Sequence, residues 1–512
     1  DPRRCRIAGV AALQYLGDEF PLESLTHQRL EVRDGKTGDI VRELAVKSAD
    51  GETGSSSAGT QTVPTSLSFR SDGVLFGIQQ GQVVRIDLMT GATHAELPAI
   101  DGQQRIAYRL AIGPDGSLHV YELPEKVIHV YDRAGQRLRT VGHPGGQVPG
   151  PWDPEKFRQV ETLVVDRTGQ TWVVESQDVP RRIVQYDAKG QLVREFLGNT
   201  HYGSGGVLDP ADKSRLFYHH IEFAIDWQSG RSRIRNMLAE WLPADLVPIR
   251  YEGQTYLVTA PLSYRPTQSV VEFYRYDEAR GTVSAAAAFG EAEAFEQLKT
   301  PAILKLLAGG KVPRDYEFLW SDQNGNGQVD PPEVTFELKN TPERLQLGRV
   351  NDRLRCWAGS RVYQPKTIVP NGAPVFEKND VATHATYELS NGDLLALHVP
   401  SERAMRYGEG KAQETRGIHR DGRVMWRYPT EHGGVSGLTL YPWEPGYVSN
   451  EFGVIGHATA HAGDLGEFVI VHGNNGMWKI WTADGFLAGQ LTRHKFDPRS
   501  IVDSSRPSVE RD

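Results

Sequence analysis

The sequence predicts an all-β fold, a single β-propeller of about seven or eight four-stranded blades, and three observations support this prediction. Pairs of hairpin patterns recur along the chain at intervals of roughly 40 to 60 residues. A glycine stands at the turn of the second hairpin in each unit. Gly (53 residues) and Pro (30 residues) are abundant in the 512-residue chain, which suits short strands and turns better than long helices.

The repeated unit is clearest between residues 110 and 198. "LAIGPDGSLHVYE" (110–122) precedes "VIHVYDRAGQRLRTVG" (127–142), and a similar pair follows at 163–176 and 183–198. Alternating apolar residues with Gly at the turns predict two hairpins per unit, with strands a, b, c and d. The turn between strands c and d recurs at Gly91, Gly135, Gly190, Gly230, Gly281, Gly422 and Gly485, with "NGAP" (371–374) as an eighth.

The rest of the chain fits one domain, residues 1–512. The hairpin at 34–44 ("DGKTGDIVREL") is expected to complete the last blade and close the ring, which removes exposed sheet edges. Residues 290–309 ("GEAEAFEQLKTPAILKLLAG") have helical composition and begin an insertion that spans 290–338. Residues 47–61 are rich in Gly, Ser and Thr and are expected to form a surface loop.

The units at 110–142 and 163–198 resemble NHL-type propeller repeats. Each has a hydrophobic strand, a DG-like turn, a second hydrophobic strand and a "YD..G" turn before a closing strand, and the resemblance covers about residues 65–200. It implies a β-propeller fold, whose members mostly bind ligands. A few are enzymes, including a zinc-dependent lyase that acts on hydroxyglycine peptides.

Charge and hydropathy argue against a nucleic-acid partner and against a membrane-spanning helix. The chain is 39% hydrophobic and 24% charged, as is usual for a globular protein. Its net charge is −8 and its Lys and Arg residues form no dense tract, so nucleic acid is not expected as a partner. No apolar run approaches the roughly 20 residues that a membrane-spanning helix needs.

One short stretch predicts a metal site. "DQNGNGQVDPPE" (322–333) matches the calcium-loop pattern D-x-[DN]-x-[DN]-G-x5-E. Oxygen donors at this spacing suit the coordination of Ca²⁺, and Gly327 falls where the loop must turn sharply. The expected ligands are Asp322, Asn324, Asn326, Gln328 through its backbone carbonyl, Asp330 through water, and Glu333 through both carboxylate oxygens.

The flanks of this loop differ from those of a helical EF-hand. Residues 315–320 ("DYEFLW") and 334–338 ("VTFEL") alternate as strands do. We therefore expect the loop to replace the turn of a β-hairpin, between strands a and b of its blade. Without two helices to reorient, calcium would stabilise the fold rather than open a sensor.

Calcium also suggests a location outside the cytoplasm. We expect a bacterial protein that is periplasmic or secreted, since calcium is plentiful there. Because the chain begins at Asp1 rather than Met, we expect an upstream segment to have been removed. The two cysteines, Cys5 and Cys356, leave a disulfide open. They form no CxxC or CxxCH motif, which excludes a zinc ribbon and covalently attached haem.

A second candidate site gathers histidines. In a propeller, the d–a and b–c connections share one face, called here the d–a/b–c face. Residues 383–399 and 456–473 resemble each other and place four histidines on this face: His384, His398, His457 and His472. Such a cluster could bind a transition metal or act as acid and base. The alternative is that these histidines recur only because the blade sequence is repeated, and that they bond to neighbouring backbone.

Further ligand-binding candidates accompany the histidines. The set comprises acids at strand-b ends, histidines near a strand entry, and aromatic residues in loops: Glu122, Glu175, His219, His220, Tyr202, Trp152 and Trp443. The remaining tryptophans singled out lie inside strand patterns and are assigned to core packing: Trp172, Trp357, Trp426, Trp478 and Trp481.

Three functions remain open from the sequence. The first is an exported, calcium-stabilised propeller that binds a carbohydrate, peptide or other small ligand on its d–a/b–c face or serves as a scaffold. The second is a metal-assisted lyase or hydrolase that uses the four histidines. The third is a domain of a larger assembly that packs against other proteins. No nucleophile elbow, phosphate-binding loop or H-E-x-x-H motif is present.

Overall fold

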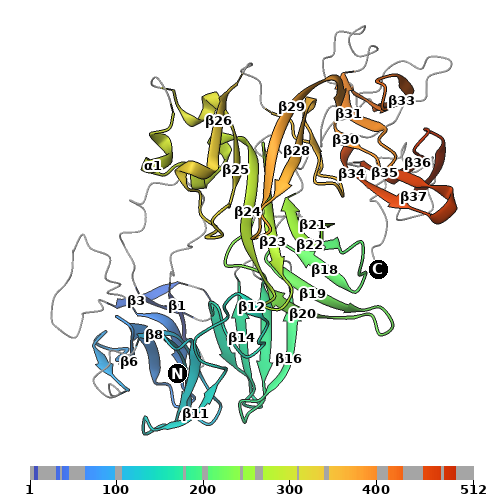
Figure 1. Ribbon diagram of the computed structural model, residues 1–512. Helices are drawn as coiled ribbons and strands as arrows, with labels where there is room; N and C mark the ends of the chain where they lie inside the picture. The colour runs from blue at the N-terminus through green and yellow to red at the C-terminus, as the bar shows by residue number, and fades with distance from the viewer. Residues whose placement is uncertain are drawn as a thin grey trace. The chain divides into compact units, whose positions relative to one another are not determined.

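The computed structural model shows small antiparallel sheets along most of the chain (Figure 1). The residues that it describes are 5–9, 30–34, 37, 39–44, 64–97, 106–176, 180–198, 206–242, 246–259, 269–307, 311–339, 345–400, 413–430, 454–473 and 478–491. The expected surface loop 47–61 and the candidate residues Tyr202 and Trp443 lie outside them. The chain divides into two compact units, Asp1–Gly205 with Tyr218–Leu242, and Gly206–Phe217 with Pro243–Asp512.

The first unit contains a three-stranded sheet and three four-stranded sheets. The three-stranded sheet has the order β1 (Cys5–Gly9), β2 (Leu30–Asp34) and β3 (Ile40–Leu44). The four-stranded sheets are β4 (Thr65–Phe69), β5 (Leu75–Gln79), β6 (Gln82–Ile86), β7 (Thr93–Ala95); β8 (Ile106–Ile112), β9 (Leu118–Leu123), β10 (Val127–Tyr131), β11 (Arg137–Val141); and β13 (Thr162–Val165), β14 (Thr171–Glu175), β15 (Arg182–Tyr186), β16 (Leu192–Leu197). Each four-stranded sheet pairs its strands in chain order.

A five-stranded sheet has the order β12-β20-β19-β18-β17. Its strands are β12 (Gly150–Pro151), β17 (Val207–Leu208), β18 (Arg215–Tyr218), β19 (Ile221–Asp226) and β20 (Arg231–Met237).

The second unit contains a six-stranded, a three-stranded and two four-stranded sheets, again in chain order. The first is β21 (Leu246–Tyr251), β22 (Gln254–Thr259), β23 (Val270–Asp277), β24 (Thr282–Glu291), β25 (Tyr316–Ser321) and β26 (Val334–Leu338). The others are β27 (Cys356–Trp357), β28 (Gly359–Ile368), β29 (Pro374–Ala385); β30 (Tyr387–Glu388), β31 (Leu394–Pro400), β32 (Gln413–Ile418), β33 (Val424–Thr430); and β34 (Val454–His461), β35 (Glu467–Gly473), β36 (Trp478–Thr482), β37 (Leu487–Leu491).

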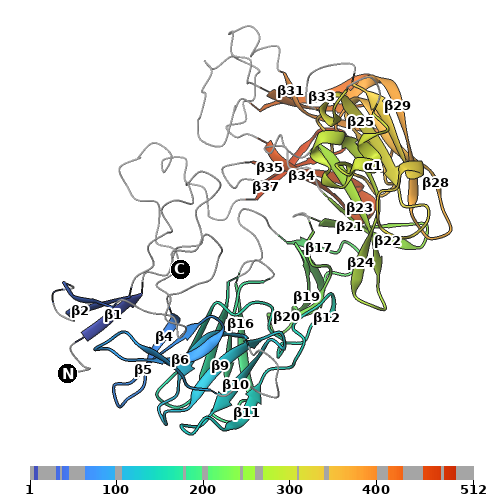
Figure 2. The ribbon, with the colours of Figure 1, turned by 90° about the vertical axis from the view of Figure 1, so that its left-hand side faces the viewer.

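The expected helical insertion is present and short. It consists of single turns at Ala292–Ala294 and Glu296–Leu298, then α1 (Pro301–Leu304); similar turns lie at Pro313–Asp315, Pro331–Glu333 and Gly463–Leu465. Phe295 stacks on Phe318 of β25 with ring centroids 5.1 Å apart, so the insertion covers one face of β25 (Figure 1 and Figure 2). None of the helices that the structure describes has the length and apolar character needed to cross a bilayer.

Consecutive sheets pack face to face within each unit, as the blades of a propeller do. In the first unit, Tyr121 of β9 and Val173 of β14 share one buried cluster. In the second unit, Phe289 of β24 stacks on Tyr363 of β28 with centroids 4.4 Å apart, and Trp426 of β33 lies 6.2 Å from Trp481 of β36. The all-β prediction is confirmed, with repeated antiparallel sheets of mostly four strands. The closed ring stays a prediction.

The turn predictions are largely confirmed, whereas one strand assignment is wrong. All eight predicted c–d turns join adjacent antiparallel strands and carry a glycine with positive φ: Gly91, Gly135, Gly190, Gly230, Gly281, Gly372, Gly422 and Gly485. The hairpin predicted at 34–44 is β2–β3, but it pairs with β1 in a sheet of its own rather than completing the last sheet. A strand pattern records local geometry and does not identify the neighbouring strand.

The core assignments of the tryptophans hold for three of five residues. Trp357, Trp426 and Trp481 are buried, Trp172 is half-buried, and Trp478 is 39% exposed. The last assignment is therefore wrong. Burial does not alternate along β36: Trp478 begins the strand and is exposed, whereas Trp481 is buried. The Cys356 thiol is free and buried, and it donates to the Gly348 carbonyl at 3.3 Å.

A buried histidine links two sheets of the first unit. His119 of β9 is 1% exposed, and its ring nitrogens lie 3.1 Å from Thr171 Oγ1 and 3.2 Å from Ser117 Oγ. Burial, helped by the charge of Arg139 and opposed by Asp115, lowers the pKa of His119 to about 4. The imidazole is therefore neutral in the folded protein at neutral pH.

The neutral state of His119 should make stability depend on pH. Between pH 6.5 and about 4 the unfolded chain binds a proton here that the folded protein does not, so the free energy of unfolding falls as pH is lowered. The loss should be on the order of 3 kcal/mol and level off below pH 4. Urea unfolding of wild type and His119→Gln at pH 7 and 4.5 checks this. Equal pH dependence of the two proteins would contradict it.

Candidate functional site

The predicted calcium loop joins β25 to β26 as the connection of a β-hairpin. Trp320 pairs with Val334 across the two strands, directly beside the loop. The prediction of a hairpin with strand flanks is confirmed. The prediction that it is an a–b turn is wrong, because β25 and β26 are the fifth and sixth strands of their sheet. In an antiparallel meander, the first, third and fifth connections share one end, so the loop still lies at the end of the a–b turn.

Side-chain oxygens of the loop accept hydrogen bonds from its own backbone. Asp322 Oδ1 accepts from Gly325 N at 2.9 Å, and Asn324 Oδ1 accepts from Asn326 N at 2.9 Å. Asn326 Oδ1 accepts from Gln328 N at 2.7 Å. A carbonyl or carboxylate oxygen has a second lone pair, so these bonds leave each oxygen able to bind a cation.

The second half of the loop folds back onto the first. Asp330 Oδ2 accepts from Asn324 Nδ2 at 2.7 Å and from Asn326 Nδ2 at 2.8 Å. Glu333 Oε1 accepts from the backbone amides of Gln323 and Asn324 at 2.8 and 2.9 Å. The side chains at positions 3, 5 and 9 of the pattern therefore contact one another, and position 12 is bonded to the start of the loop.

Glu333 has a buried carboxylate oxygen whose charge no hydrogen-bond donor among the described residues compensates. The residue is only 8% exposed, and its Oε2 atom is buried and accepts no hydrogen bond from the described residues. A buried carboxylate oxygen without a donor is costly unless a positive charge compensates it. Asp322, at the other end of the loop, is 2% exposed. Two buried acids thus bracket the loop.

The donor set fits calcium better than a transition metal. The loop supplies carboxylate, amide and backbone oxygens and no His or Cys, and Ca²⁺ takes six to eight such oxygens. Among the described residues, no three His, Cys, Asp or Glu side chains are gathered closely enough to hold a metal ion, and this includes the three acids of the loop. The loop oxygens are instead arranged by the hydrogen bonds given above.

The structure shows only part of the histidine candidate site. His384 lies near the end of β29, is exposed, and approaches Gly359 of β28. His457 of β34 pairs with Val471, while His472 of β35 pairs with Gly456, so the two backbone positions are neighbours. The side chains of His398, His457 and His472 lie outside the described residues. The predicted cluster therefore stays a prediction.

Two acids predicted to bind ligand are bonded within the first unit. Glu122 is buried near the end of β9 and accepts from Tyr131 Oη at 2.9 Å. Glu175 ends β14 and accepts from Gln159 N at 3.0 Å and from Arg182 Nε. Both carboxylates therefore have hydrogen-bond partners within the first unit, and their role in ligand binding stays a prediction.

Arg182 also reaches the tryptophan predicted as a loop contact. Trp152 follows β12 and is half-buried, and its ring lies 4.9 Å from the guanidinium carbon of Arg182. Arg182 donates further to Glu195 Oε1 at 2.6 Å and to the Pro154 carbonyl at 3.0 Å. The structure thus brings Glu175 and Trp152 together, with a buried arginine between them.

His219 and His220 form the turn between β18 and β19. Their ring centroids are 3.6 Å apart, and the residues are 7% and 2% exposed. His220 O accepts from Leu238 N at 2.7 Å, which fixes the turn to the segment after β20. Burial at this level leaves little surface for a ligand.

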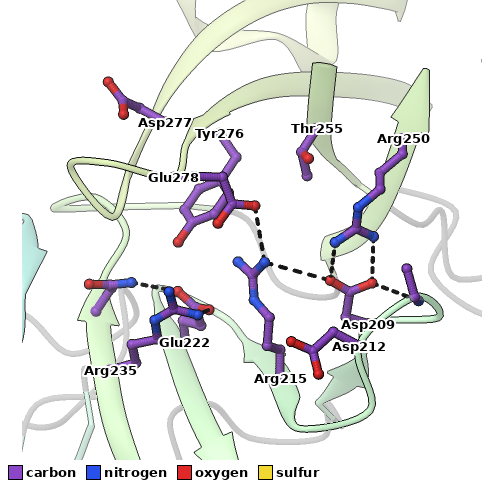
Figure 3. A network of polar contacts seen from close by, with 12 residues as sticks. Asp209, Asp212, Arg215, Glu222, Arg235, Arg250, Thr255, Tyr276, Asp277 and Glu278 are labelled. Atoms are coloured by element: carbon purple, nitrogen blue, oxygen red, sulfur yellow. Dashed lines mark hydrogen bonds and ion pairs between the residues drawn. The ribbon is translucent and has the colours of Figure 1, made fainter. Parts of the chain in front are cut away.

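The second unit contains an ion-pair network that the sequence patterns did not predict. Asp209 is fully buried, and both of its oxygens accept from Arg250, each at 2.6 Å (Figure 3). Arg215 Nη1 lies 3.8 Å from Asp209 Oδ2 and 3.0 Å from Glu278 Oε1. Burial would raise the pKa of Asp209, but the hydrogen bonds and charges of Arg250 and Arg215 lower it below its usual value. The charges pair with one another, so the network is structural.

A pocket of about 200 Å³ lies over the hairpin that carries the calcium loop. It is lined by Glu317, Phe318, Leu319, Thr335, Phe336, Glu337, Tyr363 and Lys378. Lys378 Nζ lies 2.6 Å from Glu337 Oε2 and 3.3 Å from Glu317 Oε2, so its charged groups are paired. None of the predicted ligand residues lines this pocket.

Comparison with known proteins gives similarities to solved structures only. No family model and no curated protein matches it. A solved protein of unknown function from Bacteroides caccae is similar, with 15% identity, covering 52% of this chain and 92% of its own, at a TM-score of 0.24. A chain in the crystal structure of a mitotic checkpoint complex has 11% identity, covering 61% of this chain and 86% of its own, at a TM-score of 0.21. At TM-scores this low, neither similarity supports a conclusion about this chain.

Proposed function

We propose that the chain is an exported, calcium-stabilised β-propeller that acts as a ligand-binding or scaffold protein. The main support for calcium is that Glu333 Oε2, a carboxylate oxygen, is buried and has no hydrogen-bond donor among the described residues. It belongs to a loop whose sequence matches all five specified positions of a calcium pattern. A divalent cation would compensate this charge.

The residues that would hold the ion are those of the pattern. Asp322, Asn324, Asn326, Asp330 and Glu333 offer side-chain oxygens, and Gln328 offers its backbone carbonyl. The ion would supply positive charge that draws the two ends of the loop together. Because the loop connects two strands, this stabilises the β25–β26 hairpin and the insertion packed on it.

Metal analysis and melting temperature test this assignment together. The purified protein should contain about one calcium ion per chain, and a chelator should lower its melting temperature. Restored melting temperature on adding calcium, but not sodium, supports the site. A protein that holds zinc or another transition metal and does not respond to calcium would favour the metal-assisted lyase or hydrolase instead.

The propeller assignment rests on the packing of consecutive sheets. Within each unit, several neighbouring sheets share a buried apolar cluster, as between β9 and β14 and between β24 and β28. A crystal structure tests whether the sheets close into one ring of blades. Sheets that form two separate open stacks would contradict a single propeller.

The ligand of such a protein is proposed on the d–a/b–c face. A carbohydrate or peptide is expected there, and exposed His384 is the described histidine candidate that a ligand could reach. Glycan and peptide binding screens with wild type and His384→Ala test this. A ligand that binds both proteins equally would exclude His384 from the site. Periplasmic or extracellular localisation is tested by fractionating the cells that produce the protein.

A further inference from the structure

The calcium loop is hydrogen-bonded to the turn of the next sheet. Asn371 Nδ2 donates to the backbone carbonyl of Asp322 at 2.7 Å. One residue before the loop, Ser321 Oγ donates to the Pro374 carbonyl at 2.8 Å, and Ser321 is buried. Both bonds join residues 49 to 53 positions apart in the sequence. The start of the loop is thus attached to the β28–β29 turn and to the first residue of β29.

The turn that receives these bonds is itself well organised. Asn371 Oδ1 accepts from Ala373 N at 2.9 Å, and Gly372 N donates to the Val369 carbonyl at 2.8 Å. Tyr256 Oη of β22 donates to the Gly372 carbonyl at 2.7 Å. Asn371 therefore uses its oxygen within the turn and its nitrogen toward the calcium loop.

We propose that Asn371 transmits calcium binding to the β28–β29 turn, so that the ion fastens two neighbouring sheets together. This inference rests on the proposed calcium site. Asp322 would bind the ion through its side chain, while its backbone carbonyl accepts from Asn371. Calcium that holds Asp322 in one conformation also holds that carbonyl at hydrogen-bonding distance from Asn371.

The coupling must act in both directions. If calcium strengthens the bond between Asn371 and Asp322, then this bond strengthens calcium binding by the same factor. A hydrogen bond of this kind corresponds to about a two- to tenfold change in affinity. Asn371 is therefore a positioning residue outside the predicted set of calcium ligands.

The chain offers a matched pair of variants. Asn371→Ser keeps a short acceptor for the turn but is too short to reach Asp322. Asn391 lies in the turn between β30 and β31 and has the same role within its own turn. Its Oδ1 accepts from Asp393 N at 2.9 Å, and Gly392 N donates to the Leu389 carbonyl at 3.0 Å. Its Nδ2 donates to Asp393 instead. Asn391→Ser is therefore the control.

Hydrogen exchange with and without saturating calcium tests the inference. In wild type and Asn391→Ser, calcium should slow exchange in the loop 322–333 and at the amides of Gly372 and Ala373. In Asn371→Ser, calcium should slow exchange in the loop only. Calcium titrations should show about two- to tenfold weaker binding for Asn371→Ser than for the control.

Three results would overturn the coupling. In the first, calcium slows hydrogen exchange at Gly372 and Ala373 as much in Asn371→Ser as in wild type. In the second, calcium slows exchange in the loop of wild type but not in the turn. Both results leave the calcium site intact. In the third, Asn391→Ser also loses the calcium-dependent slowing of exchange at Gly372 and Ala373. The loss in Asn371→Ser would then reflect a general weakening of turns. If calcium does not protect the loop of wild type at all, the proposed calcium site itself is wrong.

Discussion

Glu333→Gln should abolish the rise in melting temperature that calcium gives to the wild-type protein. The glutamine keeps the size of the side chain but removes the charge and one of the two carboxylate oxygens. Glu333 Oε2 is buried and has no hydrogen-bond donor among the described residues. At calcium concentrations 100 times the dissociation constant, the lost stabilisation is about 2.7 kcal/mol. In chelator, the variant should melt no lower than wild type, since a buried amide costs less than a buried carboxylate.

The control for this variant lies on the same hairpin. Glu337 of β26 is 61% exposed and is not part of the calcium pattern. Glu337→Gln should keep the whole calcium effect in differential scanning calorimetry with calcium and with chelator. A calcium response of Glu333→Gln equal to that of Glu337→Gln would show that Glu333 does not bind the ion.

Asp209→Asn should destabilise the protein by about 1.5–3 kcal/mol, because an amide cannot replace the buried carboxylate that accepts both hydrogen bonds from Arg250. Asp209 is fully buried between Arg250 and Arg215, and the Arg215 side chain is only 7% exposed (Figure 3). Since the pKa of Asp209 is lowered on folding, the stabilising charge is present at neutral pH and is lost as pH falls below about 3.8.

Asp212→Asn provides the comparison for Asp209→Asn. Asp212 lies three residues away, is exposed, and accepts from Ser214 N at 3.0 Å. Its replacement should change the free energy of unfolding by about 0.5 kcal/mol or less. Urea unfolding at pH 7 measures both variants. Equal and small effects would mean that the ion pairs around Asp209 contribute little to stability.

Local features of this chain could be predicted from its sequence. Glycines at the predicted c–d turns adopt positive φ in the structure, because a tight turn between antiparallel strands favours that conformation. The strand flanks of the calcium loop were also recognisable, since residues 315–320 and 334–338 alternate. Both features depend on residues close together in the chain.

Features that depend on distant residues could not be predicted. The loop was assigned to an a–b turn because nothing in its sequence reveals that its sheet has six strands. The place of Glu175 at a strand end could be predicted from the pattern, whereas its bond to Arg182 appears only in the structure. Asn371 was recognised as a turn residue, whereas its bond to Asp322, 49 positions away, appears only in the structure.

Titration calorimetry of calcium into the chelator-treated 512-residue protein tests calcium binding most directly. We expect binding of one calcium ion per chain in wild type and none in Glu333→Gln. A wild-type protein that binds no calcium, or a Glu333→Gln protein that binds it with unchanged affinity, would contradict the assignment of residues 322–333 as the calcium site.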